Sequence, residues 1–291
     1  MVSLLNRLFL FAVCALAVSA HAAQPMNVVW MVADDLGWRD LGCYGSAYHE
    51  TPRLDELAAG GARFTQAYAT CPVCSPTRAS LMTGKYPQRM AATDYFGAPQ
   101  PDGVAKHWTA KKPLLPAPYN NFLPLEEVTV AEALREGGFK TFFAGKWHLG
   151  GLGFLPEDQG FEINIGGGFG GGLRSYFSPY HNPSLPDGPE SEHLPLRLAK
   201  ETADFIEASR DTPFFAALCF HSVHIPLQAR EDLTTKYQRK KEALALEEEQ
   251  WGQDRDSKVR LTQNHPVYAA MVEGMDEAVG IVLDALERAG L

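Results

Sequence analysis

The sequence predicts an α/β fold with a mainly parallel central sheet flanked by helices. Three short apolar runs carry this prediction: Asn27–Ala33, Lys140–Ala144 and Phe214–Phe220. Apolar runs of this length that end at turn residues are typical of buried strands. Helical segments alternate with these runs, and that alternation favours parallel pairing, with ligands bound at the carboxyl ends of the strands.

Six segments have the apolar spacing or the flanking residues of helices. They are Pro52–Ala59, Pro76–Thr83, Val128–Glu136, Leu196–Ser209, Lys236–Glu249 and Pro266–Ala289. Glycines follow the first three, as is usual at helix ends. Lys236–Glu249 is rich in charge and is predicted to be solvated. Pro266–Ala289 is the longest, and Gly290 is predicted to cap it. A further strand is predicted at Phe64–Ala69.

Length and composition indicate a globular protein. The chain has 291 residues, of which 45% are hydrophobic, which is enough to bury one large core or two medium ones. The net charge of -9 argues against a nucleic-acid binder. It leaves room for an anionic substrate, because a local basic pocket can lie on an acidic surface.

The N-terminus predicts export. Arg7 precedes the apolar run Leu8–Val18, and Ala20-His21-Ala22 is a small-residue cleavage site. The run is too short to span a bilayer, so residues 1–22 are predicted to be a signal peptide and residues 23–291 the mature domain. An uncleaved anchor is the alternative. No later segment is apolar enough for a membrane span, and we expect a periplasmic or extracellular protein, or a lysosomal one in an animal.

The mature chain keeps Cys43, Cys71, Cys74 and Cys219. Four cysteines in a chain of this length are not a disulfide scaffold. Cys219 lies within an apolar run and is predicted to be a small buried hydrophobic residue.

Cys74-Ser75-Pro76-Thr77-Arg78 is the most informative motif. Cys71-Pro72-Val73-Cys74 alone could be a redox or zinc motif, but zinc would need two further ligands. Pro76 can begin a helix, and the free N–H groups at that helix end attract an anion. Arg78, about one turn on, can point back toward Cys74.

Polar residues also follow each of the three predicted strands. Asp34 and Asp35 are either ligands for calcium or magnesium or a turn that ends a strand. Lys146 and His148 point to the same side of an extended backbone, and the alternative is a loop with an incidental Lys and His. His221 and His224 follow the third strand.

These motifs together resemble the type I sulfatases. The resemblance rests on the segment from Cys74 to Pro87, on Val32-Ala33-Asp34-Asp35-Leu36-Gly37 with Tyr44-Gly45, on Gly145-Lys146-Trp147-His148-Leu149-Gly150 with Gly160-Phe161-Glu162, and on Ser222-Val223-His224-Ile225-Pro226-Leu227. The resemblance implies an exported hydrolase of aryl or carbohydrate sulfates. It implies conversion of Cys74 to formylglycine by a sulfatase-maturing enzyme, and a Ca²⁺ (or Mg²⁺) ion bound by Asp34, Asp35 and residue 74.

The resemblance also implies residue roles. The hydrated aldehyde at position 74 attacks sulfur, while Arg78 holds an oxygen nearby. Lys146 and His224 bind the sulfate, His224 protonates the leaving alcohol, and His148 takes the proton that releases sulfate. His221 is a weaker candidate for the sulfate contact.

The resemblance covers about the N-terminal two-thirds of a sulfatase. The family continues into a strand ending in Asp-Asn-Gly, a second sulfate-binding lysine and a smaller subdomain, and none of these is found here. Two metal ligands are therefore expected to be missing, and weak metal binding is expected. The alternatives are a phosphomonoester, phosphodiester or phosphonate hydrolase of the same superfamily, and an inactive truncated protein.

Three irregular stretches separate the predicted elements: Ala98–Pro124, Gly166–Gly172 and Ser178–Pro189. The first is expected to be a surface excursion. The other two are expected to be plain surface loops or loops near a substrate mouth.

Overall fold

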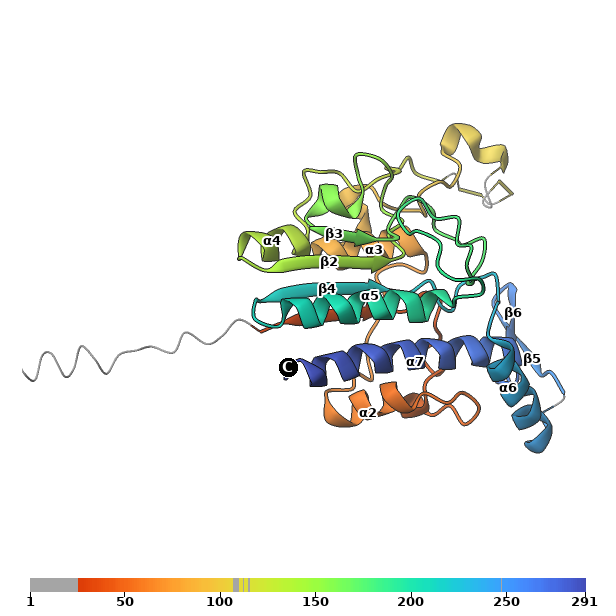
Figure 1. Cartoon of the computed structure of the whole chain (residues 1–291). Helices are drawn as coiled ribbons and strands as arrows, with labels where there is room; N and C mark the ends of the chain where they lie inside the picture. Colours follow the sequence, from red (N-terminus) through yellow and green to blue (C-terminus); the bar gives the residue numbers. More distant parts are fainter. Residues whose placement is uncertain (1–25, 107–109, 112, 115, 247) are drawn as a thin grey trace, which may run out of the picture.

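Four parallel strands form the central sheet, which confirms the predicted fold class. The computed structural model describes residues 26–106, 110–111, 113–114, 116–246 and 248–291, so the predicted signal peptide lies outside the described residues. The strands are β1 (Val28–Val32), β2 (Lys140–Gly145), β3 (Ile163–Ile165) and β4 (Phe214–Cys219). Their order across the sheet is β1-β4-β2-β3 with every pair parallel, and Figure 1 shows β2, β3 and β4 running in one direction.

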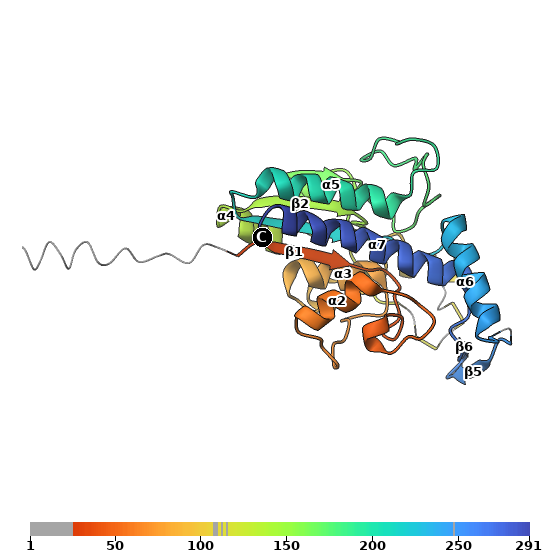
Figure 2. The ribbon, with the colours of Figure 1, turned by 60° about the horizontal axis from the view of Figure 1, so that its bottom comes forward.

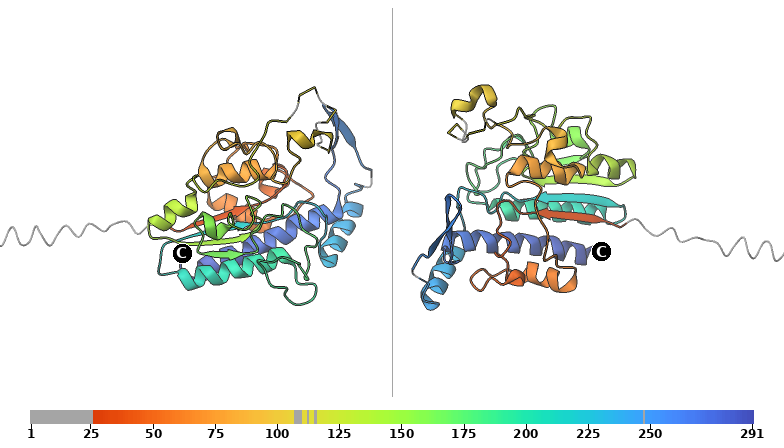
Figure 3. Two further views of the ribbon diagram at one scale, coloured as in Figure 1. Left: turned by 90° about the horizontal axis from the view of Figure 1, so that it is seen from above. Right: turned by 180° about the vertical axis from the view of Figure 1, so that it is seen from behind.

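Helices cover both faces of the sheet (Figures 1 and 3). On one face lie α5 (Leu194–Ser209) and α7 (Pro266–Arg288), and α2 (Pro52–Gly60) packs on the outer side of α7. On the other face lie α3 (Cys74–Thr83) and α4 (Val130–Glu136). Four short 3-10 helices lie in the described connections: η1 (Gly42–Tyr44), η2 (Pro87–Met90), η3 (Pro101–Lys106) and η4 (Pro156–Gln159).

A second, smaller unit lies beyond the carboxyl ends of the strands (Figure 2). It consists of α6 (Glu231–Ala243), which packs against α7, and the antiparallel hairpin of β5 (Trp251–Asp254) and β6 (Ser257–Arg260). No helix in the described part of the chain is long and apolar enough to cross a membrane.

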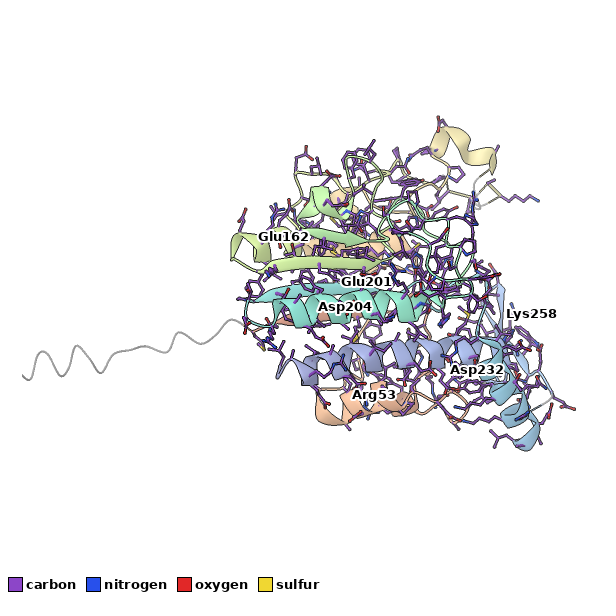
Figure 4. All side chains as sticks on the ribbon, viewed as in Figure 1. Arg53, Glu162, Glu201, Asp204, Asp232 and Lys258 are labelled. Atoms are coloured by element: carbon purple, nitrogen blue, oxygen red, sulfur yellow. The ribbon has the colours of Figure 1, made fainter. Side chains whose placement is uncertain are left out.

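The central strand β4 is buried on both faces because it is apolar at every position. Alternate residues of a strand point to opposite faces. In β4, Phe214, Ala216 and Leu218 pack in a core with α5 and α7, while Phe215, Ala217 and Cys219 pack in a second core with α3 and α4. Side chains fill the space between the sheet and its helices (Figure 4). Cys219 is buried as predicted, and the four described cysteines are free.

Asp276 connects two distant helices. Its carboxylate, on α7, accepts hydrogen bonds from the backbone N–H groups of Arg53 (3.1 Å) and Leu54 (2.8 Å) at the start of α2. These N–H groups have no partner within their own helix. A residue more than 200 positions away therefore caps α2 and fixes it against α7.

Several predicted boundaries were wrong. Phe64–Ala69 is not a strand; it is exposed and pairs with no strand in the described part of the chain. A strand without a partner would leave its backbone N–H and C=O groups without hydrogen bonds. Helix α3 begins at Cys74 rather than at Pro76. Helix α6 begins earlier than predicted, where Glu231 and Asp232 favour a helix N-terminus, and ends before Ala245, whose φ is +51°. β3 and the hairpin were not predicted.

Candidate active site

Three adjacent strands deliver the candidate residues to one edge of the sheet. The pairs that follow β1, β2 and β4 are Asp34 and Asp35, Lys146 and His148, and His221 and His224. Because β4 lies between β1 and β2, the three turns are neighbours. Backbone hydrogen bonds join them: Asp34 N donates to Ser222 O (2.8 Å), and Lys146 N donates to Cys219 O (2.8 Å).

Asp34 lies between two buried cations. Its Oδ2 forms ion pairs with Nζ of Lys146 and with Nη2 of Arg78, the latter at 3.3 Å. All three side chains are at least 90% buried, and that of Lys146 is fully buried. Nη1 of Arg78 also donates to the carbonyl of Lys146 at 2.5 Å. One carboxylate and two cations leave a local excess of positive charge, which favours an anion nearby.

Cys74 is the first residue of α3 and opens into a cleft. The cleft has a volume of about 640 Å³, and Cys74, Asp35, His148 and His224 line it with the backbone of the Gly171-Gly172 turn. The first N–H groups of an α-helix have no partner within the helix, so the Cys74 end of α3 presents donors and a positive dipole. Sequence motifs about 150 residues apart therefore meet at one cleft.

His148 is held as a neutral base. Its Nε2 lies 3.0 Å from the carbonyl oxygen of Phe96, which assigns the proton to Nε2, and its buried Nδ1 has no partner among the described residues. Burial, together with the positive charges of Lys146 and Arg78, lowers the pKa of His148 to about 4. A Cβ at position 171 would lie 2.2 Å from the ring, so this approach requires Gly171. Near pH 7, Nδ1 is a free proton acceptor.

His224 carries its proton on the other ring nitrogen from His148. Its Nδ1 lies 2.7 Å from the carbonyl oxygen of Ile225, so Nδ1 carries a proton, and its Nε2 lies 3.7 Å from Oδ2 of Asp35. The side chain of Asp35 is 61% exposed, and its backbone adopts the left-handed region with φ of +59°. His224 is partly exposed, so its Nε2 can reach a ligand in the cleft.

Tyr176 was missed by the sequence reasoning. Its hydroxyl lies 2.8 Å from the carbonyl of His221 and 2.7 Å from that of His224, so it holds the turn that carries both histidines. Burial raises its pKa above the usual value for tyrosine. His221 is itself buried, and burial together with the charge of Lys146 places its pKa well below the usual value. No local pattern around Tyr176 marks it for this position.

The residues present fit one side of a calcium or magnesium site. Asp34, Asp35 and Cys74 line a single cavity of about 310 Å³. Carboxylate oxygens are the ligands that these hard cations prefer. No group of three or more His, Cys, Asp or Glu side chains in the described ranges is arranged to hold a metal. The donor type therefore fits, and the number of protein ligands is small.

Comparison with known proteins identifies the family to which the chain belongs. Residues 26–291 match the family model described as Sulfatase. Human arylsulfatase A is 47% identical over 156 residues, covering 52% of this chain and 27% of that protein. A sulfatase of Formosa agariphila is 32% identical over 320 residues, covering 91% and 54%. The crystal structure of Ps i-CgsB in complex with k-i-k-neocarrahexaose superposes with a TM-score of 0.68 at 26% identity, covering 92% and 56%.

The chain therefore belongs to the sulfatase family. It spans about half, or less, of the length of the relatives that it matches.

Proposed function

We propose that the protein hydrolyses sulfate monoesters through a formylglycine made from Cys74. The observation that carries this proposal is the position of Cys74 at the N-terminus of α3, in a cleft lined also by His148 and His224. Family membership supports the same reaction. Carbohydrate sulfates are the favoured substrates over other aryl or alkyl sulfates, since the similar proteins include the N-acetylgalactosamine-6-sulfatase of rat and a structure with a bound neocarrahexaose.

Each residue of the cleft has a proposed role in this reaction. Formylglycine, when present, supplies a hydrated aldehyde whose hydroxyl is the nucleophile. The positive charge of Lys146 and Arg78 and the free N–H groups of α3 stabilise the negative charge on the sulfate oxygens. Nε2 of His224, which faces the cleft, protonates the leaving alcohol. Nδ1 of His148 accepts the proton whose removal releases sulfate.

A Ca²⁺ ion, or Mg²⁺, is proposed to bind to the carboxylates of Asp34 and Asp35 together with an oxygen at position 74. When bound, it would neutralise sulfate charge and lower the pKa of a nearby hydroxyl. Asp35 suits this role because its carboxylate is exposed, whereas that of Asp34 is already held between two cations.

The remaining proposals concern the whole protein and its processing. A formylglycine-generating or other sulfatase-maturing enzyme is proposed to modify Cys74. Export is proposed from the sequence of residues 1–22. A sulfated glycan or sulfated small molecule is the proposed ligand of the cleft.

Turnover of 4-nitrocatechol sulfate and of 4-nitrophenyl phosphate by the purified chain tests the reaction. The chain is coexpressed with a maturing enzyme and assayed with Ca²⁺. We expect sulfate release that Cys74→Ala abolishes and Cys71→Ser preserves, since Cys71 lies outside the motif. A higher rate with the phosphate ester would favour a phosphoester hydrolase. Equal rates for the Cys74→Ala variant and the unaltered chain would contradict the proposal.

A further inference from the structure

A second cavity adjoins the candidate active site. It has a volume of about 520 Å³ and lies between the loop that follows β3 and the loop that precedes α5. The backbone of Gly172 lines both this cavity and the cleft that holds Cys74, and His221 lines its inner wall. A ligand that occupies the cleft can therefore extend into the cavity.

Hydrogen bonds between the two loops hold the cavity open. Gly166 N donates to Ser184 O at 2.8 Å, and the Asn182 side-chain amide donates to Gly166 O at 2.9 Å. The carbonyl oxygen of that same amide accepts from Ser184 N at 2.9 Å. These bonds tie the tip of one loop to the base of the other, so the walls are formed before a ligand arrives.

The charge of the cavity suits an anion. Its basic lining residues are Arg174, His181 and His221, of which Arg174 carries a fixed positive charge, and no carboxylate lines it. Arg174 is exposed, and its guanidinium makes no ion pair or hydrogen bond with any residue in the described ranges. By contrast, Arg197 and Arg230, which follow these loops in the sequence, are both paired with carboxylates. An unpaired guanidinium in a cavity without carboxylates is available to a ligand.

The other walls of the cavity suit a sugar ring. Phe169 is 45% exposed and Leu152 is 95% exposed at its edge. Gly166, Gly168 and Gly170 also line the cavity and present backbone without side chains. Such a wall leaves room for a flat ring to pack on Phe169 while its polar substituents reach backbone groups.

We propose that this cavity is a subsite for a second sulfate group, carried by the sugar next to the one whose ester is cleaved, and that Arg174 binds it. The planar guanidinium can donate two parallel hydrogen bonds to a sulfate, which a lysine cannot do. The inference rests on the proposed function because it takes the cleft at Cys74 as the site of the cleaved ester. It adds that the preferred substrate bears sulfate on adjacent sugars.

Calorimetric titration of the whole chain tests this subsite without requiring turnover. The two probes are glucosamine 6-O-sulfate, which carries one sulfate, and a heparin-derived tetrasaccharide, which carries sulfates on adjacent sugars. Arg174→Ala is expected to weaken tetrasaccharide binding about 10-fold and to leave glucosamine 6-O-sulfate unchanged. Arg174→Lys is expected to lie between, because it keeps the charge and loses the paired donors. Arg239→Ala is the control for general charge, because Arg239 is an exposed arginine on α6 with no ion pair to any described residue.

Hydrogen exchange of the tetrasaccharide complex adds a spatial readout. We expect protection of residues 166–174 and 180–184 in the unaltered chain and its loss in Arg174→Ala.

The outcomes separate the two proposals. If Arg174→Ala and Arg239→Ala lose equal affinity for the tetrasaccharide, or if neither loses any, the subsite is refuted. Binding of the monosulfate would then leave the proposed function intact. An Arg174-dependent affinity for the tetrasaccharide without any binding of the monosulfate would support the subsite and count against the proposed function.

Discussion

Replacement of Asp34 by Asn should destabilise the protein strongly. Asn keeps the size of the side chain and removes its charge. In the structure, Asp34 is the carboxylate between Lys146 and Arg78, whose side chains are 0% and 6% exposed. The substitution therefore leaves two buried cations side by side with no counter-charge.

The size of the effect follows from this burial. Removing one partner of a buried ion pair costs about 3–5 kcal/mol, whereas an exposed pair contributes about 0–1 kcal/mol. Asp34→Asn belongs to the first class. A second substitution, Lys146→Met, removes one of the two unpaired cations while keeping the length of the side chain. The double variant should therefore regain part of the loss.

Urea denaturation at pH 7 with EDTA, followed by tryptophan fluorescence, measures the effect without a contribution from bound metal. Glu207→Gln is the matched control, because Glu207 pairs with Arg288 through side chains that are 45% and 58% exposed. If Asp34→Asn lowers the free energy of unfolding by less than about 1 kcal/mol, as Glu207→Gln is expected to do, the view that this cluster is a buried ion network is refuted.

Three further predictions follow from other contacts. His224→Ala should lower sulfatase turnover about 100-fold or more, because it removes the proposed acid, with circular dichroism unchanged; unaltered turnover would remove His224 from the mechanism. Asp276→Ala should cost about 2 kcal/mol in urea denaturation, since it leaves two N–H groups of α2 without acceptors, whereas the exposed control Asp284→Ala on the same helix should cost less. Burial lowers the pKa of His193 to about 4, so below about pH 6.5 the unfolded chain binds a proton that the folded chain does not, and the free energy of unfolding falls by about 3 kcal/mol as the pH drops toward 4. His193→Gln should therefore reduce the difference in the free energy of unfolding between pH 7 and pH 4. An unchanged difference would contradict this pKa for His193.

The central strands and long helices were predictable because local sequence and burial agree there. β4 and the Phe142–Ala144 part of β2 are apolar on both faces, as a parallel sheet covered by helices requires. β3 has only three residues with Asn164 in the middle, so it exists because β2 offers it a partner. The run Phe64–Ala69 has strand-like residues, but none of the strands in the described ranges pairs with it.

The sequence predicted which residues form the site, but not the contacts between them. The positions of Asp34, Lys146 and His148 just after apolar runs identified them as candidates. That Lys146 is buried against Asp34, and that His148 donates to Phe96, depends on how α3 and the loop after it pack against the strand ends. Tyr176 and Arg174 lie in a loop with no periodic pattern, so only the folded chain shows what they contact.

The mass of the tryptic peptide 64–78 tests the central claim, the conversion of Cys74, most directly. This peptide contains both Cys71 and Cys74. After coexpression with a maturing enzyme and alkylation of thiols, we predict a residue at position 74 that is lighter by about 18 Da than cysteine and is not alkylated. Cys71 should carry the only alkyl group. A peptide in which both cysteines are alkylated, without the loss of about 18 Da, would contradict the account.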